Sequence, residues 1–211
     1  LVYDTSGEAN PMMGVFSGEF FAGRPGTDYT KEFTRDYFFQ LNQYWLREYH
    51  VDGFRYDYVP GMYDGPVGQG YANLVFRTYE DSKALPRFDG GNGRSKIIQC
   101  AEHLPDPAGI MSQTYSNCAW QNGLLDRVRD MARWDYVSAD FAHRLDPEFL
   151  GFPNQFQNPA TGESFPVAPF QYLESHDHPR FINAFGQPQL RDLLGEFYGN
   201  RERFYKIQPY I

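Results

Sequence analysis

The chain has 211 residues, of which 41% are hydrophobic and 22% charged, so its composition is that of a globular protein and not of a disordered one. Its formal net charge of -8 argues against binding to nucleic acid or to an anionic membrane surface. Two cysteines are too few for a disulfide framework, and no apolar run is long enough to span a bilayer.

The predicted helices are segments in which apolar residues recur every three or four positions. They cover residues 35–49, 71–84, 123–134 and 188–211. Thr34 is the predicted N-cap of the first helix. The predicted apolar face of this helix consists of Phe38, Leu41, Trp45 and Tyr49.

The predicted strands are short apolar runs bounded by turn residues. They cover residues 51–57, 95–101, 116–120 and 170–175. Loops are predicted where glycine and proline interrupt the chain or where apolar residues lack a regular spacing. They cover residues 1–30, 61–70 and 135–168. Cys100 and Cys118 fall on neighbouring predicted strands, where we expect both to be buried free thiols.

Strands that alternate with helices predict an α/β fold with a parallel sheet. A complete (β/α)8 barrel has eight strands, so four strands would form half of one. The chain begins at Leu1 and ends at Ile211 within a helical pattern, which suggests an internal piece of a longer protein. Half a barrel leaves open sheet edges and an uncovered apolar face, so residues 1–211 alone are expected to be inactive and prone to aggregation.

Three of the predicted strands end in carboxylates. Arg55 and Asp57 close the first, and their spacing puts both side chains on one face of the strand. An arginine beside an aspartate favours the ionised carboxylate, which is what a carboxylate nucleophile requires. The alternative is a structural ion pair that holds a turn.

Glu102 ends the second strand, at the rim where barrel enzymes keep their chemistry. The alternative for Glu102 alone is a solvated side chain. Asp177 follows the fourth strand and is flanked by His176 and His178. A His-x-His pair can ligate a metal ion, but supporting ligands at suitable spacing are missing from the sequence. A charged loop whose side chains pair with one another is another alternative.

As a set, these segments resemble the second, third and fourth signature regions of the α-amylase family, glycoside hydrolase family 13. The matching residues are Gly53-Phe54-Arg55-Tyr56-Asp57, Ala101-Glu102 and Ser175-His176-Asp177. The resemblance covers essentially the whole chain. It implies that residues 1–211 are the central part of a catalytic (β/α)8 TIM barrel, roughly strands four to seven with their helices.

The resemblance implies a retaining glycoside hydrolase or glucanotransferase that acts on α-glucosidic bonds of starch- or glycogen-like glucans through a covalent glycosyl-Asp intermediate. Asp57 would be the nucleophile, Glu102 the general acid/base, and Asp177 the residue that holds substrate hydroxyls and distorts the sugar. Arg55 would keep Asp57 charged, and His176 would hydrogen-bond the sugar. Such an enzyme needs its two carboxyl groups about 5–5.5 Å apart, with Glu102 protonated before the reaction.

Two features depart from the α-amylase pattern. The family's first signature region is missing from the sequence, and Pro60 and Gly61 stand where α-amylases usually carry Lys-His. The second departure fits better with the branching-enzyme, isoamylase or trehalohydrolase side of the family. A 1,4-α-glucan branching enzyme or another transglycosylase is therefore an alternative.

Tyr58, Tyr63 and Tyr71 surround the glycine-rich loop and are candidates to stack on glucosyl rings, with ordinary loop packing as the alternative. The expected partner is an α-glucan or oligosaccharide, with no nucleic acid, membrane or cofactor. A structural calcium ion occurs in the family, but no ligand set is readable, so no metal site is predicted. Two further classes remain open, a non-catalytic amylase-like binding subunit and a metal-dependent barrel hydrolase; the presence of all three carboxylates and the arginine argues against the first.

Overall fold

The computed structural model describes residues 17–21, 24–134, 139, 143, 146–178 and 180. The chain divides into two compact units. The first consists of Leu1–Ala119 and Pro153–Ala168, and the second of Trp120–Phe152 and Pro169–Ile211.

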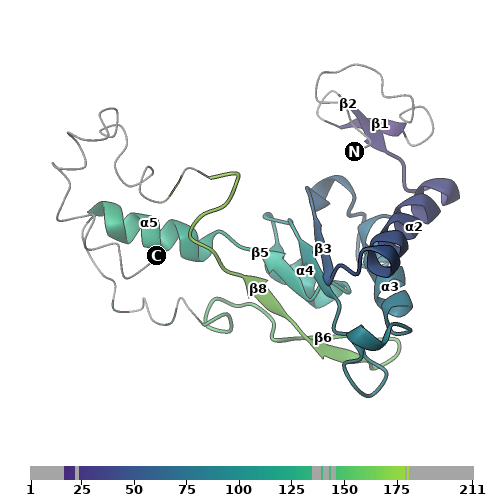
Figure 1. The fold of residues 1–211 in the computed structure, drawn as a ribbon. Coiled ribbons are helices and arrows are strands. Elements are labelled where there is room, and N and C mark those ends of the chain that lie inside the picture. Colours follow the sequence, from purple (N-terminus) through teal and green to yellow (C-terminus); the bar gives the residue numbers. More distant parts are fainter. Residues whose placement is uncertain are drawn as a thin grey trace. The chain divides into compact units, whose positions relative to one another are not determined.

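Strands and helices alternate along most of the first unit (Figure 1). Its helices are α2 (Glu32–Glu48), α3 (Tyr71–Ser82) and α4 (Pro107–Gln113), with short 3-10 helices η1 (Val59–Gly61) and η2 (Pro86–Phe88). Its strands are β1 (Ser17–Phe21), β2 (Arg24–Thr27), β3 (Gly53–Tyr56), β4 (Ile98–Ala101), β6 (Gln155–Gln157) and β7 (Ser164–Pro166). Two strands, β5 (Cys118–Trp120) and β8 (Ala168–Phe170), continue into the second unit, which also holds α5 (Gly123–Trp134).

The main sheet has four strands in the order β3-β4-β5-β8. β3 and β4 are parallel, with Arg55 opposite Cys100, and β4 and β5 are parallel, with Cys100 opposite Cys118. The α/β fold with a parallel sheet is therefore confirmed. Two separate antiparallel pairs, β1 with β2 and β6 with β7, accompany this sheet.

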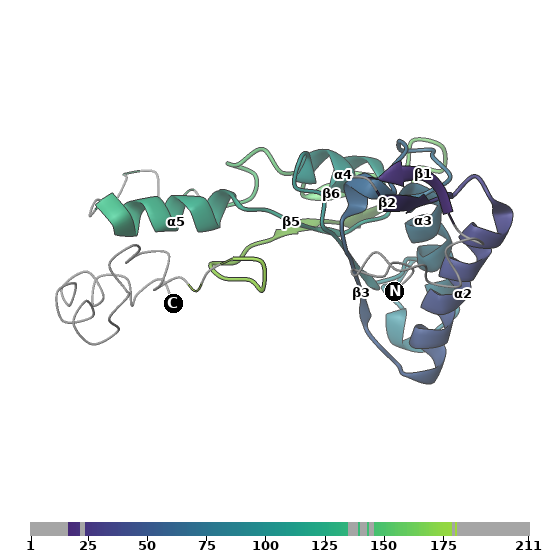
Figure 2. The same cartoon turned by 90° about the horizontal axis from the view of Figure 1, so that it is seen from above.

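Helices α2 and α3 lie side by side on one side of β3 (Figures 1 and 2). A buried hydrogen-bond network joins them to the sheet. The Asn42 amide of α2 donates to Tyr56 Oη and to Thr78 Oγ1, both at 2.9 Å, and Tyr56 donates to Gln99 Oε1 at 3.0 Å. Gln99 in turn donates to the Val75 carbonyl of α3 at 2.8 Å. Burial raises the pKa of Tyr56 well above its ordinary value, so the phenol keeps the proton that it donates.

The opposite face of the sheet carries Gly53, Arg55, Ile98 and Cys100, because side chains alternate along each strand. Ile98 on this face has 52% of its surface exposed. Ile98 is therefore an uncovered apolar side chain on an interior strand of the sheet.

The second unit is built around α5, whose buried side chains are Leu124, Leu125, Val128 and Met131. Trp120 packs against Tyr172 with ring centroids 4.8 Å apart, and the Tyr172 hydroxyl donates to the Asn122 side chain. Burial of one helix face and of these rings gives this unit its own small core.

The predicted helices 71–84 and 123–134 are confirmed as α3 and α5, and the strands predicted at 51–57, 95–101 and 116–120 as β3, β4 and β5. The helix predicted at 35–49 exists but begins earlier, at Glu32, with Lys31 and not Thr34 as its N-cap. Thr34 is instead buried within the first turn. The predicted helix 188–211 lies outside the described residues.

The apolar face predicted for this first helix is partly wrong. Trp45 and Tyr49 are exposed, whereas Asn42 and Leu46 are buried. The buried amide is tolerated because Tyr56 and Thr78 satisfy its hydrogen bonds.

Three further corrections concern loops and strands. Two segments predicted as loops, 1–30 and 135–168, contain the antiparallel pairs β1–β2 and β6–β7. The strand predicted at 170–175 overlaps β8 at Phe170 alone, because β8 ends at that residue. Short strands of this kind depend on their partner for hydrogen bonds, so local sequence carries little signal for them.

Both cysteines are free, but only Cys100 is buried; Cys118 is half-buried, so the prediction for it is wrong. The two residues are direct neighbours across β4 and β5. A hydrogen bond from Cys100 lowers the pKa of the Cys118 thiol, against the effect of burial. Within the described residues, none of the helices has the length and apolar character to cross a membrane.

The Tyr56 network predicts a stability effect for one hydroxyl group. Tyr56→Phe leaves the Asn42 and Gln99 side chains each short of one buried partner, so we expect a loss of about 1–3 kcal/mol in the free energy of unfolding. Urea denaturation of the wild type and variant measures this loss. Tyr44→Phe, at an exposed tyrosine of α2, is the matched control and should stay within about 0.5 kcal/mol of the wild type. An equal effect at both positions would contradict the role of the network.

Candidate active site

The candidate site lies where β3 and β4 end. Tyr56 and Ala101 are opposite each other in the parallel pair, so the residues that follow them, Asp57 and Glu102, emerge at the same edge of the sheet. A Cβ atom on Gly53 would lie 2.0 Å from the Ile98 carbonyl oxygen, so a glycine lets the two strands approach closely at their start. This close pairing brings the two carboxylates to one place.

Arg55 contacts both carboxylates. Its guanidinium forms an ion pair with Asp57, and a second ion pair joins its Nη2 to Glu102 Oε2 at 3.0 Å. The Asp57 side chain is 78% exposed, whereas that of Glu102 is 16% exposed. The two acids therefore share one cation but differ in their access to solvent.

Glu102 is held by the backbone of the segment that follows Asp57. The Tyr58 N–H donates to Glu102 Oε2 at 2.7 Å, and the Val59 N–H donates to the Glu102 carbonyl at 3.0 Å. Tyr58 adopts left-handed backbone angles, φ 47° and ψ 55°, which are unfavourable for a residue with a side chain. This conformation turns its N–H toward Glu102 and leaves its ring 48% exposed.

Tyr63 is the second tyrosine predicted to bind substrate. Its hydroxyl donates to Gln113 Oε1 at 2.9 Å, and its ring packs edge-on against His103, with centroids 5.4 Å apart. Partial burial, together with the charges of Asp106 and Asp64, raises the pKa of Tyr63. Tyr63 is thus held beside the residue that follows Glu102.

The glycine-rich loop 61–70 is closed by Asp64, whose carboxylate accepts hydrogen bonds from the Gln69 N–H at 2.8 Å and the Gly70 N–H at 3.0 Å. Tyr71, which follows the loop, is fully buried and hydrogen-bonded to Ser116. The expectation that Tyr71 stacks on a sugar is therefore wrong. Its ring belongs to the core, packed edge-on against Tyr56.

His176 and Asp177 belong to the second unit and are described within it. Both side chains are largely exposed, and His176 Nε2 lies 3.3 Å from an Asp177 oxygen. The His176 ring contacts the Trp120 ring edge-on. The expectation that Asp177 joins Asp57 and Glu102 in one site stays a prediction.

The two histidines considered as metal ligands have other partners. His178 Nδ1 lies 2.6 Å from the Ser175 hydroxyl, and His176 pairs with Asp177. Among the residues that the structure describes, no group of three or more His, Cys, Asp or Glu side chains is arranged to hold a metal ion.

The sequence predicted no role for His103, and it did not predict helix α4 or a role for Gln113, which α4 carries. Asp106 caps α4 by accepting from the Gly109 N–H at 2.8 Å, and Pro107 opens the helix. Asp followed by Pro is a recognisable helix start, so this signal was present in the sequence. His103 is half-buried, and burial lowers its pKa while the charge of Asp106 opposes the shift.

Comparison with known proteins finds a likeness to solved structures. No protein-family model matches the sequence, and no curated protein matches it. The crystal structure of a noncanonic maltogenic α-amylase, AmyB from Thermotoga neapolitana, matches with a TM-score of 0.50 and 20% sequence identity. The match covers 79% of this chain and 34% of that chain, so this chain spans about a third of the solved structure's length. The likeness shows an amylase-like α/β fold.

The left-handed backbone of Tyr58 predicts an unusual order of stability between two substitutions. Glycine tolerates positive φ, whereas a β-branched valine does not. We expect the free energy of unfolding of Tyr58→Val to be lower than that of Tyr58→Gly by about 1 kcal/mol or more. Urea denaturation of both variants measures this difference.

The same pair of substitutions at Tyr44, an exposed position within α2, is the matched control. Glycine is the less stable of the two there, because it weakens a helix interior by about 1 kcal/mol relative to alanine. The order of Gly and Val should therefore reverse between positions 58 and 44. Finding valine the more stable residue at both positions would contradict the assignment.

Proposed function

We propose that this chain carries the catalytic carboxylates of a retaining glycoside hydrolase or glucanotransferase acting on α-glucosidic bonds. One observation carries the proposal: a single guanidinium, that of Arg55, contacts two carboxylates that follow adjacent parallel strands. A pair of carboxylates, one ionised and one able to donate a proton, is what glycosidic bond cleavage requires. The amylase-like fold supports the same reading.

In the proposed reaction, an Asp57 oxygen attacks the anomeric carbon and Glu102 gives its proton to the departing glycosidic oxygen. The bond between that carbon and oxygen breaks as the glycosyl–Asp57 ester forms. Glu102, now ionised, then removes a proton from water or from a sugar hydroxyl, whose oxygen displaces Asp57. Water gives hydrolysis, and a sugar hydroxyl gives transfer.

The surroundings of the two acids suit this division of roles. Asp57 is the more exposed acid, with 78% of its side chain accessible, so its carboxylate is open to a sugar as a nucleophile must be. Glu102 accepts from Tyr58 and contacts Arg55 through Oε2, so Oε1 is the oxygen that these two contacts leave for a substrate. A glycosidic oxygen would receive its proton from that atom.

The remaining roles follow the family resemblance. Asp177 would hold substrate hydroxyls and distort the sugar, and His176 would hydrogen-bond it. The exposed side chain of Tyr58 would contact a glucosyl unit, and so would Tyr63, beside His103. The four strands of the main sheet would be strands four to seven of a (β/α)8 barrel.

A transglycosylase such as a 1,4-α-glucan branching enzyme is the second candidate. Pro60 and Gly61 form the 3-10 turn η1, where the α-amylase pattern has a lysine and a histidine. This turn offers no charged side chain to a bound sugar. The proposed site therefore differs from that of an α-amylase just beyond the nucleophile.

Product analysis with the full-length protein tests the proposal. Wild type, Asp57→Asn and Asp52→Asn would each be incubated with malto-oligosaccharides and amylopectin, and products resolved by chromatography with linkage analysis. We expect Asp57→Asn to lose activity by at least about 10³-fold, the order seen when a covalent nucleophile is removed. Asp52→Asn is the matched control. Asp52 is exposed and precedes the start of β3, whereas Asp57 follows its end, so this substitution should leave activity unchanged.

The products distinguish the candidates. Shorter sugars made by the wild type indicate hydrolysis, whereas longer or newly branched chains indicate transfer. Absence of any product with the wild type would contradict the catalytic proposal and favour a non-catalytic binding subunit. Full activity in Asp57→Asn would contradict the assignment of the nucleophile.

A further inference from the structure

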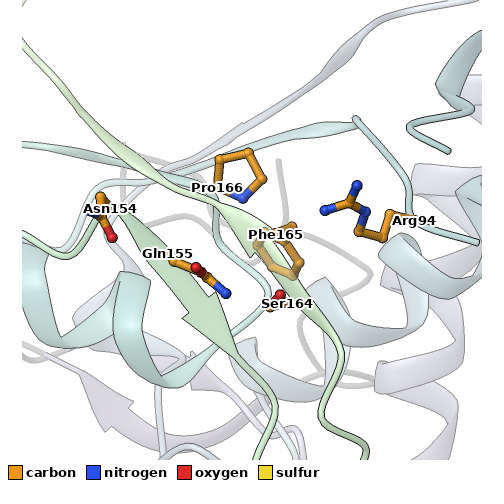
Figure 3. A pocket seen from close by; sticks show the side chains of 6 residues that line it. All are labelled: Arg94, Asn154, Gln155, Ser164, Phe165 and Pro166. Carbon is orange, nitrogen blue, oxygen red and sulfur yellow. The ribbon is translucent and has the colours of Figure 1, made fainter. Parts of the chain in front are cut away.

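The first unit contains a cavity of about 350 Å³ at the β6–β7 hairpin. Its lining combines one cation, two amides, a hydroxyl and two apolar side chains: Arg94, Asn154, Gln155, Ser164, Phe165 and Pro166. In Figure 3 the Arg94 guanidinium points toward Pro166 and Phe165 from one side, and Gln155 and Ser164 lie next to each other below them. The volume is within the range of small-molecule sites, roughly 300–1,000 Å³.

The hairpin that forms the cavity is anchored. Phe156 and Phe165 are paired across it and point into the core, where Phe165 packs against Tyr79 with centroids 5.1 Å apart. Glu163, next to Ser164, forms an ion pair with Lys83 at 2.8 Å. Burial alone would lower the pKa of Lys83, but hydrogen bonds to Glu163 and Glu80 raise it to about 12. The cavity wall is thus fixed to α3, and the alternate residues of the hairpin face outward.

Arg94 reaches the cavity from the tight turn before β4. Gly91, Asn92 and Gly93 all have positive φ in this turn, and the Arg94 N–H donates to the Gly91 carbonyl at 3.1 Å. The side chain's Nε contacts the same carbonyl at 3.3 Å. Within the described part of the chain, Arg94 has no carboxylate partner. Because no described carboxylate pairs with its guanidinium, half-buried Arg94 creates a local positive potential on a chain whose net charge is -8.

We propose that this cavity binds a small sugar derivative that carries an anionic group, a phosphoryl or a carboxylate. Arg94 would hold the anion through its terminal nitrogens, since a guanidinium matches the geometry of both groups. The Gln155 amide and the Ser164 hydroxyl offer donors and acceptors to sugar hydroxyls. Pro166, which is exposed, provides an apolar surface for the C–H face of a ring.

The cavity is separate from the candidate active site. Arg94 precedes β4, whereas Glu102 follows it, so the two residues lie at opposite ends of the same strand. A ligand in the cavity would not contact Asp57 or Glu102. The inference therefore stands apart from the proposed catalytic function, and a binding measurement tests it without reference to activity.

Isothermal titration calorimetry of the full-length protein with glucose 6-phosphate, glucuronate, glucose and inorganic phosphate provides the test. We expect at least one of the two anionic sugars to bind more tightly than glucose and than phosphate alone. Arg94→Gln should weaken that binding at least about tenfold, the order expected when a charge-assisted hydrogen bond is lost. Lys96→Gln, which removes an exposed charge near Arg94 but outside the lining, should leave it unchanged.

A second variant, Gln155→Ala, removes an amide from the exposed face of β6 and should weaken binding without affecting thermal unfolding. Tighter binding of glucose 6-phosphate would assign a phosphoryl ligand, and tighter binding of glucuronate a carboxylate ligand; either supports the site. Equal binding of glucose and the anionic sugars, equal affinities in wild type and Arg94→Gln, or no binding at millimolar concentration would overturn it. Binding of phosphate as tight as that of the anionic sugars would also overturn the proposed sugar ligand.

Discussion

Parallel, in-register pairing of β3 with β4 is the constraint on which the candidate site depends. It aligns Tyr56 with Ala101, so that Asp57 and Glu102 leave the sheet at one edge. Gly53 permits the close approach at the start of the pair, and the buried contact of Tyr56 with Gln99 links the two strands behind the site. Arg55 then contacts both carboxyl groups and holds them at one place. A shift of one residue in this register would move every side chain of β3 to the other face and dismantle the site.

The sequence predicted those parts of the fold that have a strong local period. Helices α3 and α5 each bury one apolar face, and that face is visible as regular spacing. The hairpin β6–β7 was not predicted, because its strands are three residues long and depend on a buried aromatic cluster assembled from distant segments. The buried face of α2 was predicted wrongly because it includes Asn42. This amide can be buried only because residues of β3 and α3 satisfy its hydrogen bonds.

The candidate site also has contacts that local sequence predicts and contacts that it does not predict. The pairing of Arg55 with Asp57 was predictable, because residues two apart on a strand share a face. The contact of Arg55 with Glu102 depends on the register of two strands and is not visible in local sequence. The left-handed backbone of Tyr58 could not be predicted either, since tyrosine has no preference for positive φ. The structure thus adds a backbone donor for Glu102 that the motif alone does not contain.

The proposed mechanism requires a covalent bond between Asp57 and a glucosyl unit, which can be detected by trapping the intermediate. Full-length Glu102→Gln protein would be incubated with an α-glucosyl fluoride, whose leaving group needs no acid, and its peptides analysed by mass spectrometry. The account predicts one added glucosyl unit on the peptide that contains Asp57, and none when Asp57→Asn is combined with Glu102→Gln. A glucosyl unit attached to another residue, or substrate turnover with no adduct in either protein, would contradict the account.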